Sequence, residues 1–273
     1  MERSPNPLSP SAIFPEPGSH PWSDRLLVLE ETDSTNLLAK AEVRKGAPGG
    51  TVIVADRQTA GRGRLGRSFL SPGDVGVYFS AILRPNCPPR ELMHLTCAVA
   101  VAMCDAVEAA YGFRPGIKWT NDLVYEGKKL GGILTELCLN PKNGLVDAAI
   151  VGVGINCRQE RSDFDPSIRD MACSARMILG KDVDRNRLIG EMIRAMACCD
   201  RDLLTGQEEM LRRYRRDCVT LGKEISIVRG DEVRHGVALD LDSDGGLIVR
   251  LDSGEIQTVS SGEVSIRGLY GYI

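Results

Sequence analysis

The sequence predicts an α+β fold in which a mixed, largely antiparallel sheet is packed with helices and followed by a small C-terminal β-barrel. Strand-like runs between residues 117 and 156 follow one another through tight turns, which favours antiparallel pairing. Residues 91–111 form a nearly all-apolar run of helical length, which must lie inside the fold. From Leu221 onward, short alternating runs are separated by RGDE, DSDGG and DSGE, a texture typical of a small barrel.

The remaining elements follow in order along the chain. RLLVLEE begins the sheet, and TDSTN then places Thr32, Asp33 and Ser34 where a helix needs an N-terminal cap. The segment from Arg57 to Gly73 has neither helical nor strand periodicity, so it is expected to be a loop. The expected strands are 25–31, 51–56, 75–83, two strands within 117–140 joined at Glu126-Gly127, and 145–156, and the expected helices are 36–46, 91–111 and 184–219.

Three regions are expected: a lead-in at 1–24, a main domain at 25–220 and the barrel at 221–273. The lead-in holds six prolines and five serines with little periodicity, so it is expected to be extended or flexible. A helix-turn-helix reader of DNA needs about three short amphipathic helices, and this segment cannot supply them. We therefore expect no N-terminal DNA-binding domain and no DNA partner.

Composition narrows the class of protein further. The chain has 273 residues, is 42% hydrophobic and has a formal net charge of −3, so it can bury a large core and is not built as a basic, nucleic-acid-binding protein. No run approaches the roughly 20 apolar residues of a membrane span, and no secretory signal is apparent, so we expect a cytoplasmic protein. Nine cysteines scattered through apolar segments indicate reduced core thiols, and their spacing does not suggest a zinc site.

Residues 61–67 read GRGRLGR, with Arg62, Arg64 and Arg67 between glycines. The first six letters match G-x-G-x-x-G, but a dinucleotide-binding turn must lead into a helix, and this one leads through RSFLSPGD into a strand. A disordered arginine-glycine tract that binds RNA is disfavoured, because the motif occurs once inside a folded domain. The remaining interpretation is a loop whose glycines and arginines bind phosphate or carboxylate oxygens. Because residues 57–73 contain four arginines and no acid, we expect this loop to be poorly ordered until an anion arrives.

Three further motifs carry polar groups beside strands. KWTND places Lys118, Asn121 and Asp122 together, which suits either a magnesium site or an ordinary capped turn. In KKLGGIL, Lys129 could reach substrate oxygens over a bare glycine backbone, or be a solvated lysine. VGVGIN alternates small residues, either for close approach to the sheet or at a bulge, and ends on Asn156. LRRYRRD, at 211–217, is either a solvated helix face or a surface that steers an acidic partner.

The motifs TDSTN, QTAGRGRLGR, KWTNDL, KKLGGIL and GVGIN, in this order, resemble those of the biotin protein ligase family. The resemblance covers about residues 25–271, and the pairing of the glycine-arginine loop with the KWTND strand is its most specific part. It implies a catalytic domain like that of the class II synthetases and an SH3-like C-terminal barrel. Related lipoate ligases share this fold but not the loop.

The resemblance also implies roles for individual residues. The implied biotin-binding residues are Ser34, Thr35, Asn36, Gln58, Arg62, Gly63, Arg64, Lys129 and Gly132. The implied ATP-binding residues are Gly61, Arg62, Arg64, Arg67, Phe69, Asn121 and Asn156, with Mg²⁺ at Asp122. The implied catalytic residues are Lys129, Arg62 and Arg64. Two positions depart from the family pattern: Thr120 stands where proline is usual, and Phe69 where a tryptophan often stacks on adenine.

The implied activity has two steps. Biotin reacts with ATP to give biotinyl-5'-AMP, and a lysine of a biotin carboxyl carrier protein then takes the biotinyl group. We expect biotin, ATP, Mg²⁺ and the carrier domain to be the molecules that the chain binds, with no membrane partner and with a homodimer as one possible assembly. The alternatives are a ligase of the same fold for lipoate or another acyl group, and a biotin-responsive regulator without enzyme activity.

Overall fold

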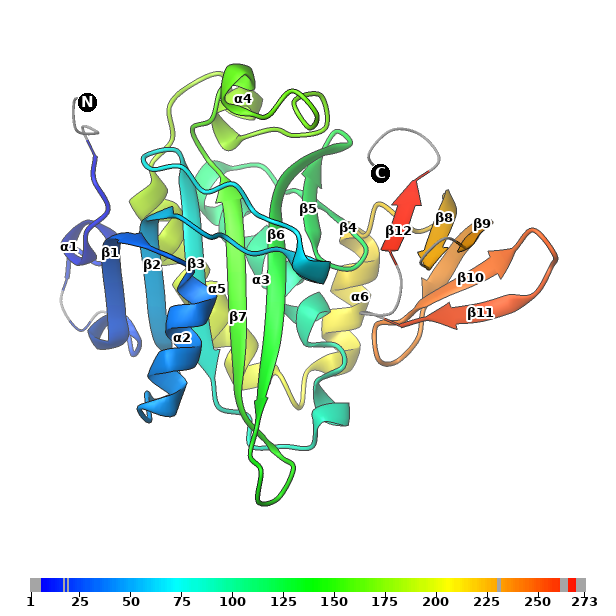
Figure 1. Ribbon diagram of the computed structural model, residues 1–273, viewed down its shortest axis with the longest axis horizontal. Helices are drawn as coiled ribbons and strands as arrows, with labels where there is room; N and C mark the ends of the chain where they lie inside the picture. Colours follow the sequence, from blue (N-terminus) through cyan, green and yellow to red (C-terminus); the bar gives the residue numbers. More distant parts are fainter. Residues whose placement is uncertain (1–5, 17, 19, 230–231, 261–264, 269–273) are drawn as a thin grey trace.

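The computed structural model describes residues 6–16, 18, 20–229, 232–260 and 265–268. A seven-stranded mixed sheet forms its centre, with strand order β1-β2-β3-β7-β6-β5-β4 (Figure 1). Only β1 and β2 pair in parallel, which confirms the expected, largely antiparallel sheet. The strands are β1 Leu26–Thr32, β2 Thr51–Gln58, β3 Gly76–Leu83, β4 Gly116–Lys118, β5 Asp122–Tyr125, β6 Lys128–Leu139 and β7 Val146–Asn156.

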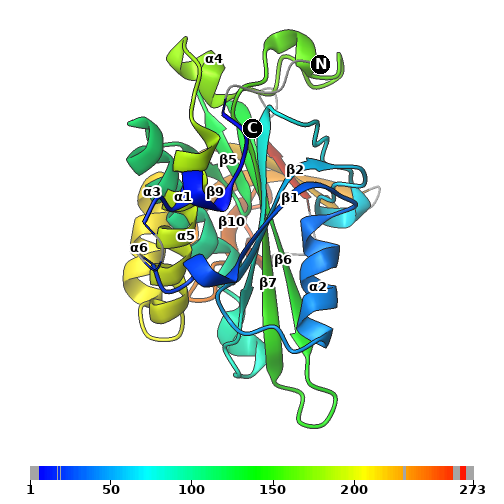
Figure 2. The ribbon, with the colours of Figure 1, turned by 90° about the vertical axis from the view of Figure 1, so that its left-hand side faces the viewer.

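Helices cover both faces of this sheet. Figure 2 shows α2 (Thr35–Arg44) alone on one face, and α3 (Leu95–Tyr111), α5 (Arg185–Asp202) and α6 (Gln207–Asp217) together on the other. The shorter helices are α1 Pro10–Ile13 and α4 Ala175–Leu179, with 3-10 turns η1 Ser23–Arg25, η2 Arg64–Gly66, η3 Pro89–Leu92 and η4 Arg161–Asp163. Because β2, β3 and β7 lie between the two helical layers, their apolar runs are buried on both sides.

The apolar run at 91–111 is the core helix that the sequence predicts, but α3 begins at Leu95. Pro88 and Pro89 lead into the separate turn η3, which accounts for the four-residue difference. Within the described residues, the 23-residue stretch Pro89–Tyr111 is long and apolar enough for a membrane span, so the expectation that no run approaches that length is wrong. Its most apolar window is 72% buried against the rest of the protein, as in a core helix.

Three strands, and not two, occupy residues 117–140. The expected turn at Glu126-Gly127 is present, and both residues have positive φ, as a tight hairpin turn requires. The additional break falls at Trp119, Thr120 and Asn121, between β4 and β5. This break leaves the polar groups of KWTND on a turn at the edge of the sheet.

A second, five-stranded antiparallel sheet follows α6, with order β11-β10-β9-β8-β12. Its strands are β8 Glu224–Arg229, β9 Glu232–Leu241, β10 Leu247–Leu251, β11 Ile256–Val259 and β12 Ser265–Gly268. DSDGG and DSGE form turns as expected, whereas RGDE contains Gly230 and Asp231, outside the described residues. The Trp119 indole donates to the Gly245 carbonyl at 2.9 Å and so ties this sheet to the KWTND turn.

The described residues of the lead-in pack on the main domain. This corrects the expectation that the segment is extended or flexible. Ile13 and Phe14 are buried against α5, and Trp22 is 8% exposed and fills the space over Gly50. The apolar residues between the prolines supply enough buried surface to fix this segment. Before β1, the described residues hold one four-residue helix and one 3-10 turn, so they contain no three-helix DNA-reading unit.

Two other expectations can be compared with the structure. All nine cysteines are free thiols, as expected, and burial raises the pKa of Cys97 and Cys157 to about 12. The basic motif LRRYRRD lies on α6, where each of its four arginines pairs with a carboxylate of this chain. This pairing favours the solvated or structural interpretation over a surface that steers an acidic partner.

Candidate functional site

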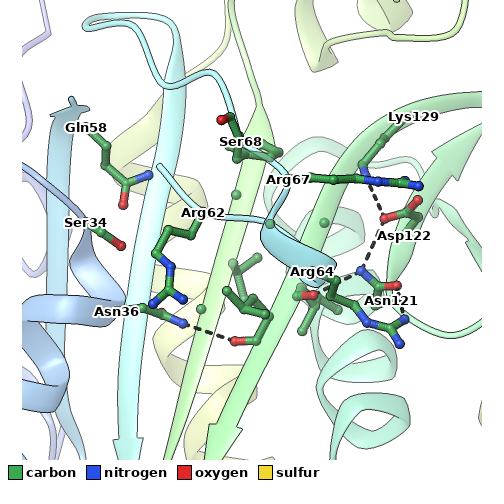
Figure 3. Close-up of a pocket in the computed structure, with 18 of the residues that line it drawn as sticks. Ser34, Asn36, Gln58, Arg62, Arg64, Arg67, Ser68, Asn121, Asp122 and Lys129 are labelled. Atoms are coloured by element: carbon green, nitrogen blue, oxygen red, sulfur yellow. Dashed lines mark hydrogen bonds and ion pairs between the residues drawn. The ribbon is translucent and has the colours of Figure 1, made fainter. Parts of the chain in front are cut away.

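A cavity of about 450 Å³ lies between the 57–73 segment, the N-terminus of α2 and the ends of β5, β6 and β7. Figure 3 shows its two ends: Ser34, Asn36 and Gln58 at one, and Asn121, Asp122 and Lys129 at the other. The residues that the sequence singled out and that line it are Ser34, Thr35, Asn36, Gln58, Arg62, Gly63, Arg64, Arg67, Phe69, Lys118, Asn121, Asp122, Lys129 and Gly132. Segments distant in sequence thus converge on one site.

The 57–73 segment, which we call the flap, is a short ladder closed by η2 and not an irregular loop. Its two arms are joined from Gln58 N to Ser71 O at 3.0 Å, and from Gly63 N to Arg67 O at 2.7 Å. In Figure 1 the flap is the cyan segment that crosses in front of β7 and β6. Backbone pairing between the arms explains how a sequence without strand periodicity forms a defined structure.

The flap contains no acid, but acids elsewhere in the chain pair with two of its four arginines, which corrects the expectation that none of these charges has a counter-charge. Arg57 pairs with Glu31 at 3.0 Å, and Arg62 Nη1 lies 3.5 Å from Glu136. Arg64 Nη1 donates to Asn121 Oδ1 at 2.8 Å and to Thr120 Oγ1 at 3.0 Å. Burial lowers the pKa of the Arg64 guanidinium, and the nearby Asp122 carboxylate opposes this shift. Arginine still remains charged, so Arg64 presents a positive charge to the cavity.

Gln58 organises the end of the cavity beside α2. Its Oε1 accepts from Thr35 N at 2.9 Å and from Thr35 Oγ1 at 3.2 Å, while its Nε2 donates to Ser71 Oγ. Ser34 stands at the N-cap, but its side chain makes no capping bond. The cap expected from TDSTN itself is therefore supplied by Gln58, from the neighbouring strand.

Glu136 holds a residue of the cavity wall in place, and sequence reasoning missed it. It accepts from Asn36 Nδ2 at 3.0 Å and from Lys40 Nζ at 2.6 Å, and it faces Arg62. Burial alone would raise the pKa of Glu136, but the hydrogen bonds from Lys40 and Asn36 outweigh it, so the pKa lies below its ordinary value. The carboxylate thus fixes Asn36 in the cavity wall. No motif marks it, because its partners are about 70 to 100 residues away in sequence.

Lys129 and Asp122 form an ion pair of 2.7 Å at the other end of the cavity. A β-bulge between β5 and β6 leaves Leu130 without an opposite residue, so that Lys129 pairs with Val124 and Gly132 with Asp122. In a regular strand, successive residues alternate between the two faces of the sheet. The extra residue changes this alternation, so that Lys129 and Gly132 share one face and the Lys129 side chain extends over Gly132. A Cβ on Gly132 would lie 3.4 Å from Lys129 Cε, so the bare backbone expected beneath this lysine is present.

The small residues of VGVGIN receive side chains of this same chain. A Cβ on Gly152 would overlap Asn36, and one on Gly154 would overlap the Phe69 ring. Phe69 also makes an edge contact with Tyr78, with ring centroids 6.3 Å apart. These glycines allow the flap and α2 to approach the sheet closely, which favours the close-approach interpretation over a bulge.

Two residues expected at the site do not line the cavity. Asn156 donates to the Cys173 carbonyl at 3.1 Å and accepts from Gln159, so its side chain is engaged by the segment after β7. Gly61 packs beneath Phe69 O and Ser71 Oγ, within the flap ladder. Ile168 and Met171 line the cavity instead, and they lie in a segment whose sequence carries no periodic signal. Met171 O accepts from Lys129 N at 2.7 Å and holds that segment against β6.

Magnesium ligands are few at this site. Asp122 is the only acid among the described residues that line the cavity, and the described part of the chain has no cluster of three or more His, Cys, Asp or Glu that could hold a metal. One carboxylate suits an ion held mostly by substrate phosphates and water, which is how Mg²⁺ is commonly bound. The donor set therefore fits magnesium that arrives with a phosphate-bearing ligand.

Comparison with known proteins gives the class of protein that has this mixed sheet, cationic flap and small C-terminal sheet: it is that of the biotin and lipoate protein ligases. Residues 28–156 match the biotin/lipoate A/B protein ligase family, and residues 220–267 match the biotin protein ligase C-terminal domain. The chain belongs to the biotin protein ligase family, which confirms the resemblance, the fold class and the enzyme class inferred from sequence.

Individual relatives support this assignment. The bifunctional ligase/repressor BirA of Bacillus spizizenii is 32% identical over 97% of this chain and 81% of its own length. The biotin--[acetyl-CoA-carboxylase] ligase of Paracoccus denitrificans is 30% identical over 88% of this chain and 100% of its own. The Aquifex aeolicus biotin protein ligase, solved in complex with biotin and ATP, superposes with a TM-score of 0.76 at 31% identity, covering 89% of this chain and 99% of that one.

Proposed function

We propose that this chain joins biotin to ATP as biotinyl-5'-AMP and transfers the biotinyl group to one lysine of a biotin carboxyl carrier protein. The observation that carries this proposal is that Arg62, Arg64 and Lys129 line one cavity together with the neutral polar side chains of Ser34, Asn36 and Gln58. Biotin has the matching chemistry, with a neutral ureido ring at one end and a carboxylate at the other. The hydroxyl and amide groups of Ser34, Asn36 and Gln58 suit the ring, and the cations suit the carboxylate.

The first step needs positive charge where the phosphate is attacked. A biotin carboxylate oxygen bonds to the α-phosphorus of ATP, and pyrophosphate leaves with the electron pair of the broken P–O bond. Lys129, Arg62 and Arg64 stabilise the charge on the phosphoryl oxygens. Magnesium held at Asp122 would add positive charge at these oxygens. Phe69 and Asn121 are assigned to the nucleotide, and Phe69 offers a smaller π face than tryptophan would.

The second step needs the adenylate to be kept from water. The unprotonated amine of the acceptor lysine attacks the biotinyl carbonyl carbon, AMP leaves, and the amide loses a proton. Meanwhile the flap covers the reactive anhydride and excludes other nucleophiles. Thr120, where the family usually has proline, keeps every polar group of the KWTND turn and adds a hydroxyl that accepts from Arg64.

Biotin-dependent exchange of labelled pyrophosphate into ATP tests the first step, with lipoate as the control acid. Exchange with lipoate and not biotin would replace this proposal with the lipoate-ligase alternative. Transfer of labelled biotin to a carrier domain, with and without ATP, tests the second step. A mobility shift with promoter DNA but no exchange would favour the non-enzymatic regulator instead.

Assembly and location complete the proposal. The strand β1 ends the main sheet and leaves Leu27 43% exposed, so a second copy could pair along this edge to form a homodimer. Light scattering of the purified chain would measure this. A cytoplasmic location also stays a prediction, since carrier domains of carboxylases must be reached where they are made, and cell fractionation would test it.

A further inference from the structure

Arg185 is the largest fully buried side chain of the described residues, and its charge has no role in the mechanism above. It is the first residue of α5, on the face of the sheet opposite α2. Its side chain is 0% exposed. Burying a charged guanidinium costs free energy unless hydrogen-bond acceptors surround it. The acceptors of Arg185 therefore show which segments this side chain holds together.

Both ends of the flap supply those acceptors. Arg185 Nη1 donates to Asp56 Oδ1 at 2.6 Å and to the Gly76 carbonyl at 3.1 Å, and Nη2 donates to Asp74 Oδ1 at 3.3 Å. Asp56 immediately precedes the flap and Asp74 immediately follows it. We call these two flanking residues the stems of the flap. Asp56 Oδ2 also accepts a hydrogen bond from Asp74 N at 3.1 Å, so the two stems are bonded directly to each other. One buried fork thus holds both stems of the flap together.

The surroundings of Arg185 hold this fork in place. Asp184 caps α5 by accepting from Asn186 N at 2.9 Å, and the Asn186 side chain bonds to Asn6 and to the Pro7 carbonyl. On the flap side, Tyr78 donates to the Pro72 carbonyl at 2.8 Å. The stems are therefore fixed from the far side of the sheet, while the arginines at the flap tip face the cavity.

We propose that Arg185 is a positioning residue that sets the rest position of the flap by clasping Asp56 and Asp74. It touches no substrate. It limits movement to the part of the flap beyond its stems, so that the tip closes over the adenylate as a hinged unit. This inference rests on the proposed function for its consequence in catalysis, but the clasp itself can be tested without any substrate.

The sharpest variant is Asp74→Asn. Asp74 is 53% exposed and has φ of 67°, a conformation that asparagine tolerates well, so this substitution removes the charge while the backbone can stay as it is. The matched control is Asp147→Asn. The Asp147 carboxylate is 48% exposed and pairs with Arg84, and it lies near the first residue of β7, away from the flap. Trypsin cleaves after arginine, so cleavage at Arg62, Arg64 and Arg67 reports opening of the flap.

In the ligand-free protein, flap cleavage should be up to about fivefold faster in Asp74→Asn than in the wild type and the control, the size expected for removing the charge from one half-exposed ion pair. The temperature of global unfolding should stay close to that of the control. Equal cleavage rates in all three proteins would overturn the clasp. Arg185→Lys provides a second measure, because it keeps the charge but loses the fork, and it should also open the flap if it folds.

A further readout separates the clasp from the proposed reaction. If the chain forms biotinyl-5'-AMP, Asp74→Asn should release a larger fraction of it into solution than Asp147→Asn does. Faster cleavage without any adenylate in the wild type would leave the clasp standing and overturn the proposed function. Adenylate formation with an unchanged released fraction would overturn the catalytic role of the clasp.

Discussion

Lys129 Nζ lies 2.7 Å from Asp122 Oδ1, and the two side chains meet above Gly132. The bulge at Leu130 brings them to one face, since an unbroken ladder would place Lys129 and Gly132 on opposite faces. The pair joins the carboxylate proposed to hold magnesium to the lysine proposed to contact the phosphoryl oxygens. The chemistry of the site depends on this local irregularity.

Lys129→Met should abolish most of the adenylation while the protein stays folded. Loss of one preorganised cation at a developing negative charge lowers the rate by about 10² to 10³-fold. Pyrophosphate exchange measures the rate, and circular dichroism checks the fold. Lys128→Met, one residue earlier on β6 and outside the cavity, is the control and should retain exchange. Unchanged exchange in Lys129→Met would remove this lysine from the mechanism.

Arg64→Gly should release biotinyl-5'-AMP about tenfold faster, a factor that corresponds to about 1.4 kcal/mol and to the loss of its hydrogen bonds to the KWTND turn. Released adenylate would then biotinylate bystander proteins, which a streptavidin blot detects. Arg57→Gly, whose guanidinium pairs with Glu31 away from the cavity, is the control. A variant that only slows adenylation and labels no additional protein would argue against the lid role.

Gly152→Ala should destabilise the protein and weaken biotin binding together. The added methyl overlaps Asn36, which is buried and hydrogen-bonded to Ser80 and Glu136. Neither the strand nor the Asn36 side chain can move aside without losing packing or hydrogen bonds. Overpacking of this kind costs about 1–3 kcal/mol. Gly49→Ala, whose methyl would lie 3.4 Å from Arg84 Cγ and so make an ordinary van der Waals contact, is the control. Thermal unfolding and the KM for biotin are the measurements, and no change in either would contradict the assigned packing.

The contribution of Glu136 to stability should depend on pH. Its pKa is lower in the folded protein than in the unfolded chain, so its contribution is fully present above the unfolded pKa and is lost as the pH falls through the folded value. Glu136→Gln should therefore cost about 1–3 kcal/mol at pH 7. The difference from the wild type should shrink below roughly pH 4. Urea titrations at the two pH values measure it, and a difference that does not change with pH would show that the ion pair contributes nothing.

The sequence by itself determined the elements whose signals are local. The apolar run of α3, the turn at Glu126-Gly127 and the glycines of GRGRLGR can each be interpreted from a few neighbouring residues, because periodicity and backbone preference belong to the segment itself. The ordered motifs likewise indicated the family. Most of the residues assigned to the site by that resemblance do line the cavity.

Only the tertiary structure decided which groups meet. Glu136 faces Arg62, Gln58 caps α2, and Arg185 clasps the stems of the flap, and each of these contacts joins residues far apart in the chain. The bulge at Leu130 and the packing of the lead-in on α5 likewise depend on strand register and on buried area, which no single segment specifies. The run of arginines in the sequence shows that the flap needs acceptors for its charges. Which acceptors it meets is decided by the pairing of the strands and by the packing of the helices on the sheet.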